Sequence, residues 1–156
     1  MFVWDSESGE ERQLSQRKLW SFAISPDGGQ LALFDYGNQA EPKGLFVMPS
    51  AGGTARLLVR TRDNRGAVAW SPDGHQLVYA ISDNSSADGT PATIHCEFWR
   101  VPSQGGEPQP LGLTVDGMVM SLRVHPDGQR IVYATLRSSS EIWAMENFLP
   151  KAGAAK

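Results

Sequence analysis

The chain has 156 residues, enough for a domain with its own core, and its 40% hydrophobic and 20% charged residues are typical of a globular protein. A formal net charge of −3 argues against a general nucleic-acid binder, and no apolar run reaches the roughly 18 residues of a membrane span. Sixteen glycines and ten prolines, spread along the chain, indicate many turns between short strands.

The first predicted elements are two short strands, Met1–Trp4 and Glu11–Leu14. The apolar and aromatic residues of Met1–Trp4 correspond in pattern to the third strand of the repeated unit described below, and Glu11–Leu14 corresponds to the fourth. We therefore expect residues 1–14 to be the end of a preceding unit.

A Pro-Asp-Gly turn then occurs three times, each copy followed by an apolar strand-like run. The turn residues are Pro26, Asp27, Gly28, Pro72, Asp73, Gly74, Pro126, Asp127 and Gly128. Proline presets φ, aspartate accepts hydrogen bonds from nearby amides, and glycine tolerates positive φ, so the motif is suited to closing a hairpin. Because it recurs in every unit, we interpret these aspartates as structural turn residues rather than as metal ligands or catalytic acids.

Each repeat is predicted to contain up to four strands, and the last lacks its fourth. The first strands are expected at Trp20–Ile24, Ala67–Trp70 and Met118–Val124, the second at Leu31–Phe34, Leu77–Ala80 and Ile131–Ala134, the third at Leu45–Met48, Phe98–Val101 and Ile142–Met145, and the fourth at Arg56–Val59 and Pro110–Leu113. With the two N-terminal strands, the prediction comprises 13 strands.

Four antiparallel strands in roughly 45 residues are typical of a β-propeller blade. The predicted fold is therefore all-β: a partial β-propeller of about three four-stranded antiparallel blades within residues 1–147. Blades are expected at 18–59 and 66–113, a last blade without its outer strand at 118–147, and a C-terminal tail at 148–156.

The stretch Trp70-Ser71-Pro72-Asp73-Gly74, with Leu77–Ala80 and Phe98-Trp99, resembles the TolB-type WD40-like (PD40) repeat. The segment Glu141–Pro150 is similar to the closing end of large bacterial proteins in which such a propeller follows a Ser/Thr kinase or a winged-helix regulator domain. The resemblance implies a non-catalytic interaction, sensory or scaffold module. An alternative is the propeller of a prolyl-oligopeptidase-type peptidase or another propeller enzyme whose catalytic part is absent.

The predicted blades are too few for a closed ring, which normally has 4 to 8. One explanation is that N-terminal blades upstream of Met1 are missing from this chain. The other is a homodimer that forms a six-bladed ring, in which each missing fourth strand comes from the partner and Met1–Trp4 is surplus.

The predicted hairpins divide the connections between two ends of the blades. The Pro-Asp-Gly and Gly-Gly turns fall at one end, and connections of varied length fall at the other: Asp35–Lys43, Arg60–Gly66, Asp83–Ala92, Thr114–Gly117 and Arg137–Ser140. Varied loops on a rigid scaffold are the usual place for binding residues. We expect a protein or peptide partner to bind there, and the candidate residues, which suit a carboxylate or phosphate group, are Lys43, Arg60, Arg62, Arg65 and Arg137.

Other residues that bear chemistry point to no cofactor. The three histidines lack the spacing of metal ligands, and Asp83–Gly89 lacks the distal glutamate of a calcium loop, so no metal is expected. Cys96 and the five tryptophans are interpreted as packing residues within strands. We expect a cytoplasmic location if the chain is complete, and a periplasmic or other extracytoplasmic location is the alternative if it ends a larger TolB-like protein.

Overall fold

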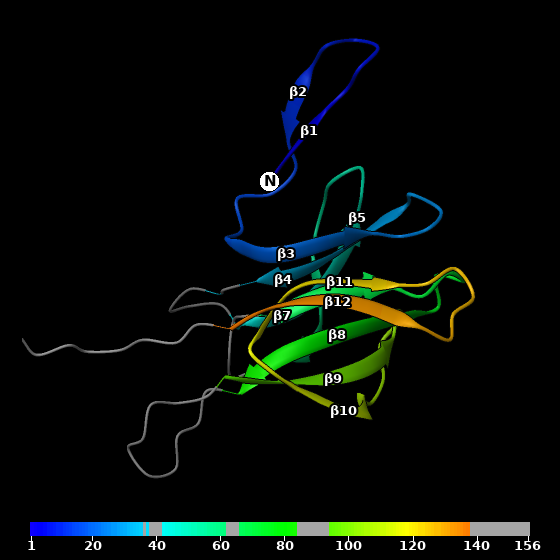
Figure 1. The fold of residues 1–156 in the computed structure, drawn as a ribbon. Helices are drawn as coiled ribbons and strands as arrows, with labels where there is room; N and C mark the ends of the chain where they lie inside the picture. Colours follow the sequence, from blue (N-terminus) through cyan, green and yellow to red (C-terminus); the bar gives the residue numbers. More distant parts are fainter. Residues whose placement is uncertain (36, 38–41, 62–65, 84–93, 138–156) are drawn as a thin grey trace, which may run out of the picture.

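The computed structural model describes residues 1–35, 37, 42–61, 66–83 and 94–137. Within these residues the chain forms twelve β-strands and no helix. The strands group into four antiparallel sheets, two of four strands and two of two strands (Figure 1). The predicted all-β, partial-propeller architecture is therefore confirmed. The predicted strand Ile142–Met145 and the tail 148–156 lie outside the described residues.

Two sheets are complete four-stranded blades, and in each one every strand is antiparallel to its neighbours along the chain. The first comprises β3 (Leu19–Ile24), β4 (Gln30–Asp35), β5 (Gly44–Pro49) and β6 (Arg56–Arg60). The second comprises β7 (Gly66–Trp70), β8 (Gln76–Asp83), β9 (His95–Pro102) and β10 (Gln109–Asp116).

The strands of the second blade extend beyond the predicted apolar runs. β10 continues through residues 114–116, which pair with Glu97, Cys96 and His95, so the predicted connection Thr114–Gly117 is wrong and only Gly117 separates β10 from β11. The prediction placed strands only at apolar runs. Backbone pairing between strands does not depend on apolar side chains, and it continues to polar residues such as Asp83, which is opposite His95.

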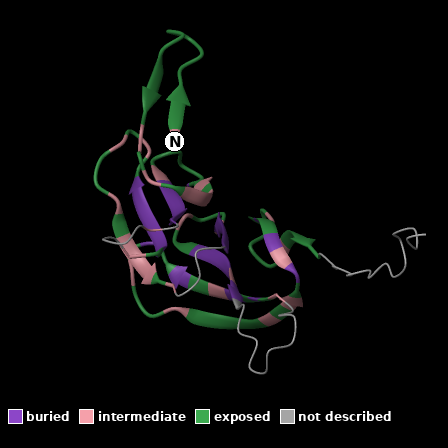
Figure 2. Cartoon of the chain, turned by 90° about the vertical axis from the view of Figure 1, so that its left-hand side faces the viewer, coloured by how far each residue is buried: buried purple, intermediate pink, exposed green. Residues whose placement is uncertain are grey.

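The other two sheets are half blades. β1 (Phe2–Trp4) pairs with β2 (Glu11–Gln13), and β11 (Met118–Val124) pairs with β12 (Ile131–Leu136). Figure 2 shows the exposed β1–β2 hairpin standing away from the buried strands of the complete blades.

Hydrogen bonds to the neighbouring blade identify which half the β1–β2 hairpin represents. The guanidinium of Arg12 on β2 donates to the carbonyl of Ala51 over 2.6 Å, in the turn between β5 and β6. Arg56 on β6 donates in the same way to Gln104 (3.1 Å) and Ser103 (3.0 Å), in the turn between β9 and β10. The β1–β2 hairpin therefore contacts the first complete blade in the same way as the β5–β6 hairpin contacts the second. Because β5 and β6 are the outer strands of their blade, β1 and β2 form the outer half of a blade.

The hydrophobic cores lie between successive sheets. One core joins β4 and β5 to the second blade through residues such as Phe34, Val47 and Tyr79. Another joins that blade to β11, and a third lies on the opposite face of the first blade, where Met1 and Leu14 pack against Leu31, Leu33, Phe46 and Met48. Because β7 packs against both β3 and β11, these three are the inner strands of successive blades.

Candidate functional site

The antiparallel strand order places the connections at two ends of the blades. The Pro-Asp-Gly turns and the Gly-Gly turns share one end, which we call the turn end. The connections from β4 to β5, β6 to β7 and β8 to β9, together with Gly117, share the other, which we call the loop end.

At the turn end the first two repeated aspartates accept hydrogen bonds from their own turns. Asp27 accepts from the hydroxyl of Ser25 over 2.5 Å and from the amide of Gly29 over 3.0 Å. Asp73 accepts from Ser71 over 2.5 Å and from the amide of His75 over 3.0 Å. The serine hydroxyl bonds, followed by the amide bonds, lower the pKa of both carboxyls.

The third turn replaces the serine with His125. Asp127 accepts from the amide of Gln129 over 2.9 Å and from the guanidinium of Arg130 over 2.8 Å, and His125 Nδ1 lies 3.0 Å from its carboxylate. The amide of Gln129 is the main cause of the lowered pKa of Asp127. All three turn carboxylates therefore bind groups of their own turns.

The loop end of the first blade carries exposed cations at the ends of neighbouring strands. Gly44 pairs with Arg60, and the amide of Thr61 donates to the carbonyl of Lys43 over 3.2 Å, so Lys43 and Arg60 lie beside each other. Both side chains are exposed, as is that of Lys18, which precedes β3 at the same end. Sequence reasoning missed Lys18, although its place just before a first strand was the available signal.

Of the other predicted cations only Arg137 is among the described residues, and it is not brought to this group. Arg137 is exposed directly after β12, and its Nε donates to the carbonyl of Asp116 over 3.2 Å. The Asp116 carboxylate lies 2.9 Å from His95 Nδ1, so this part of the loop end has mixed charge. Arg62 and Arg65 lie outside the described residues, as does most of Asp83–Gly89.

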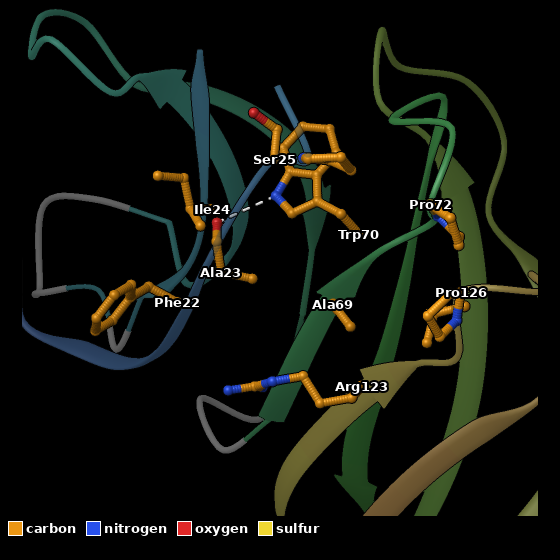
Figure 3. A pocket seen from close by; sticks show the side chains of 11 residues that line it. Phe22, Ala23, Ile24, Ser25, Ala69, Trp70, Pro72, Arg123 and Pro126 are labelled. Atoms are coloured by element: carbon orange, nitrogen blue, oxygen red, sulfur yellow. Dashed lines mark hydrogen bonds between the residues drawn. The ribbon is translucent and has the colours of Figure 1, made fainter. Parts of the chain in front are cut away.

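A hollow with a volume of about 610 Å³ lies where the three inner strands approach the turn end (Figure 3). Phe22 and Ile24 of β3 form its exposed apolar wall, and the Arg123 side chain extends from β11 toward the β3 side. The Trp70 indole donates to the carbonyl of Ala23 over 3.1 Å beside it. Sequence reasoning did not predict this hollow. Its only ionisable lining residue is an arginine, so it is suited to contact rather than to acid–base chemistry.

Buried residues in the blades act as packing residues. Cys96 is almost fully buried, with its Sγ within 3.5 Å of the Ser82 hydroxyl, and burial raises the pKa of Tyr79 to about 12. Among the described residues no cluster of histidine, cysteine and acidic side chains is arranged to hold a metal ion, and no helix is long and apolar enough to cross a membrane.

One packing prediction for the tryptophans is wrong. Trp70 is buried, and Trp20 and Trp99 are partly buried against the same core, but Trp4 on β1 is largely exposed. The reason is that β1 has no inner strand beside it in the described sheets. Trp143 lies outside the described residues.

Comparison with known proteins relates the chain to a solved propeller. No family model and no curated protein sequence matches it. The crystal structure of TolB from Acinetobacter baumannii superposes with a TM-score of 0.60 at 15% sequence identity and covers 89% of this chain. The match spans 32% of the TolB chain, so this chain corresponds to about a third of that protein. At this identity the likeness establishes a TolB-like propeller fold.

Proposed function

We propose that this chain is a non-catalytic protein-interaction module that binds a protein or peptide through its loop end. The observation that carries the proposal is the group of exposed cations Lys18, Lys43 and Arg60 at one end of a single blade. The aspartates of the turn end, by contrast, already bind groups within their turns.

The register of the first blade fixes the spacing of these cations. Leu19, Asp35, Gly44 and Arg60 are opposite one another across β3, β4, β5 and β6. Because neighbouring strands lie about 4.8 Å apart, the backbones of Lys43 and Arg60 are about one strand spacing apart and that of Lys18 about two from Lys43. Asp35 lies between them, but it is buried and ion-paired with Arg17, so it leaves the outward-facing charge positive.

This arrangement suits a partner with several carboxylates or phosphate groups along an extended segment. Arginine offers a planar fork of donors and lysine a flexible point charge, so both recognise such groups. Arg62, Arg65 and Arg137 belong to the same proposal, with Arg137 contributing from the last sheet. We also propose that this chain consists of PD40-type repeats and belongs to a larger bacterial signalling protein. In that protein it would be the sensory or scaffold part, beside a kinase or winged-helix domain.

A fluorescent oligo-glutamate peptide tests the loop end directly by anisotropy at low and moderate salt. We expect Lys43→Glu and Arg60→Glu each to weaken binding at least about threefold, because each replaces an attraction with a repulsion. The matched control is Arg100→Glu, an exposed arginine on β9 toward the turn end, which binds Gln109 over 3.1 Å. Equal losses in all three variants, or none in the first two, would contradict the proposal.

A further inference from the structure

Two residues on the inner strand of the first blade are exposed where their counterparts are buried. Counted from the turn aspartate, Phe22 corresponds to Val68 and Ile24 to Trp70. Phe22 and Ile24 are 58% and 60% exposed, whereas Val68 and Trp70 are 2% and 7% exposed. The second blade buries these positions against the first blade, whereas no described residue covers Phe22 and Ile24 on β3 in the same way.

In the last sheet, the exposed face is the one that corresponds to the face turned toward the following blade in the two complete blades. Val132 on β12 corresponds to Ala32 on β4 and to Val78 on β8. It is 62% exposed, whereas Ala32 is fully buried and Val78 is 8% exposed. Ala32 and Val78 each pack against the blade that follows, and the described residues contain no blade after β12. The open faces of β3 and β12 are therefore the two sides of the interface that already joins successive blades of this chain.

The half blades at the two ends of the described chain are also complementary. The β1–β2 hairpin is the outer half of a blade, because Arg12 makes the contact that Arg56 makes one blade later. β11 and β12 are the first two strands of a repeat and so form an inner half. One outer half and one inner half make a four-stranded blade.

We propose that two copies of this chain close into one six-bladed ring, in which β12 of each copy pairs with β1 of the other. The register follows the complete blade, where Ala32 lies opposite Val47. Val3 pairs with Arg12 as Val47 pairs with Arg56, which places Val132 of one copy opposite Val3 of the other. Two sets of twelve strands make six blades of four, a number within the range of closed propellers.

This assembly differs from the expectation that a partner supplies a fourth strand alone. Here each copy supplies a third and a fourth strand, so Met1–Trp4 is no longer surplus and takes the place that the sequence predicted for Ile142–Met145. The two identical interfaces are related by a twofold axis along the ring axis, and the association stops at the dimer. Phe22 and Ile24 become buried against the partner, and the edges of β1 and β12 that have no neighbouring strand among the described residues become paired. The proposal is independent of what the loop end binds.

Light scattering of the purified chain tests the stoichiometry. We expect a mass of twice the 17.0 kDa of one chain, and we expect Phe22→Asp to reduce it to a single chain mass while the circular dichroism spectrum stays unchanged. Leu111→Asp is the matched control, because Leu111 is exposed on the outermost strand β10 and should leave the dimer intact. If Phe22→Asp fails to fold, Ile24→Lys takes its place. A wild-type mass equal to one chain, or a series of masses larger than two chains, overturns the proposal.

Cysteine cross-linking tests the strand pairing itself. Opposite residues of antiparallel strands have Cα atoms about 4.5 to 5.5 Å apart, within reach of a disulfide. A mixture of a Val3→Cys chain and a Val132→Cys chain should give a covalent dimer, and neither chain should give one alone. An Ala134→Cys chain mixed with Val3→Cys, two residues out of register, should cross-link far less. Cross-linking of Val3→Cys with itself, or no cross-link in the first mixture, overturns the proposed ring.

Discussion

The indole nitrogen of Trp70 donates a hydrogen bond to the carbonyl of Ala23 over 3.1 Å, and this contact joins the inner strands of two successive blades. Trp99, in the same blade, provides a natural comparison because it is packed against the same core. Its indole nitrogen is buried and has no hydrogen-bond partner among the described residues. The two indoles therefore pack against the same core, but only the Trp70 nitrogen has a hydrogen-bond partner there.

We expect Trp70→Phe to lower the free energy of unfolding by about 1 to 2 kcal/mol more than Trp99→Phe does. Both substitutions replace an indole with a smaller ring, but only the first removes a hydrogen bond, and the second removes a buried donor that has no partner among the described residues. Urea unfolding followed by fluorescence, at one protein concentration, measures the difference. A larger loss for Trp99→Phe would show that the indole contact to Ala23 contributes little.

The turn aspartates predict a dependence of stability on acid. The pKa of Asp73 is lowered from 3.8 in the folded chain, chiefly by the Ser71 hydroxyl, so the unfolded chain takes up a proton at higher pH than the folded chain. The stabilisation is fully present above the unfolded value and is lost as the pH falls through the folded value. The same sign applies to Asp27 and Asp127. We expect the urea concentration at the unfolding midpoint to decrease as the pH is lowered below about 4. The decrease should be smaller in Asp73→Asn than in the wild type.

Ser71→Ala separates this titration from a general effect of acid. Without the hydroxyl, the pKa of Asp73 should move back toward its ordinary value, so the stability lost on acidification should be smaller and should be complete at a higher pH than in the wild type. Identical acid profiles for wild type, Ser71→Ala and Asp73→Asn would rule out a contribution from this turn.

The parts of the fold that the sequence predicted are those set by local chemistry. Proline, aspartate and glycine specify each hairpin by their own φ preferences and hydrogen bonds, so the turns at Asp27, Asp73 and Asp127 could be recognised without knowing what packs around them. Apolar runs such as Leu31–Phe34 mark strands that are buried on both faces, and here the predicted and observed positions differ by one residue at each end.

The parts that the sequence did not predict depend on neighbours. Trp4 and Val132 are of residue types that are usually buried in strands. Only the arrangement of the sheets shows that each is on a strand with an exposed face. The hollow beside Phe22 is likewise formed by three strands that are far apart in the chain. Lys18 belongs to the loop end because β3 begins there, which a search for basic clusters along the sequence does not detect.

Gly66 offers a test of how closely successive blades approach. A Cβ at this position would lie 2.6 Å from the Ala80 carbonyl oxygen and 2.6 Å from the ring of Phe34 in the preceding blade. We expect Gly66→Ala to lower the free energy of unfolding by about 1 to 3 kcal/mol, since backbone and ring must both move. Gly29→Ala is the control, because its Cβ would meet only the Asp27 carboxylate at 3.5 Å. Equal effects of the two substitutions would argue against close contact at Gly66.

The ion pair of Arg17 and Asp35 links the segment between β2 and β3 to the first blade. Arg17 donates to the buried Asp35 carboxylate, and its guanidinium lies 4.5 Å from the centre of the Phe46 ring. Replacing one partner leaves a buried charge without its counterpart, whereas replacing both removes that penalty.

A double-mutant cycle with Arg17→Met and Asp35→Leu measures this coupling. We expect Asp35→Leu alone to lower the free energy of unfolding by about 2 to 4 kcal/mol, somewhat less than for a fully buried pair because Arg17 is partly exposed. The double variant should be more stable than the sum of the single losses predicts, by about 1 to 3 kcal/mol, because neither charge is left alone. Strict additivity would show that the two residues act independently and that Arg17 is held mainly by the ring of Phe46.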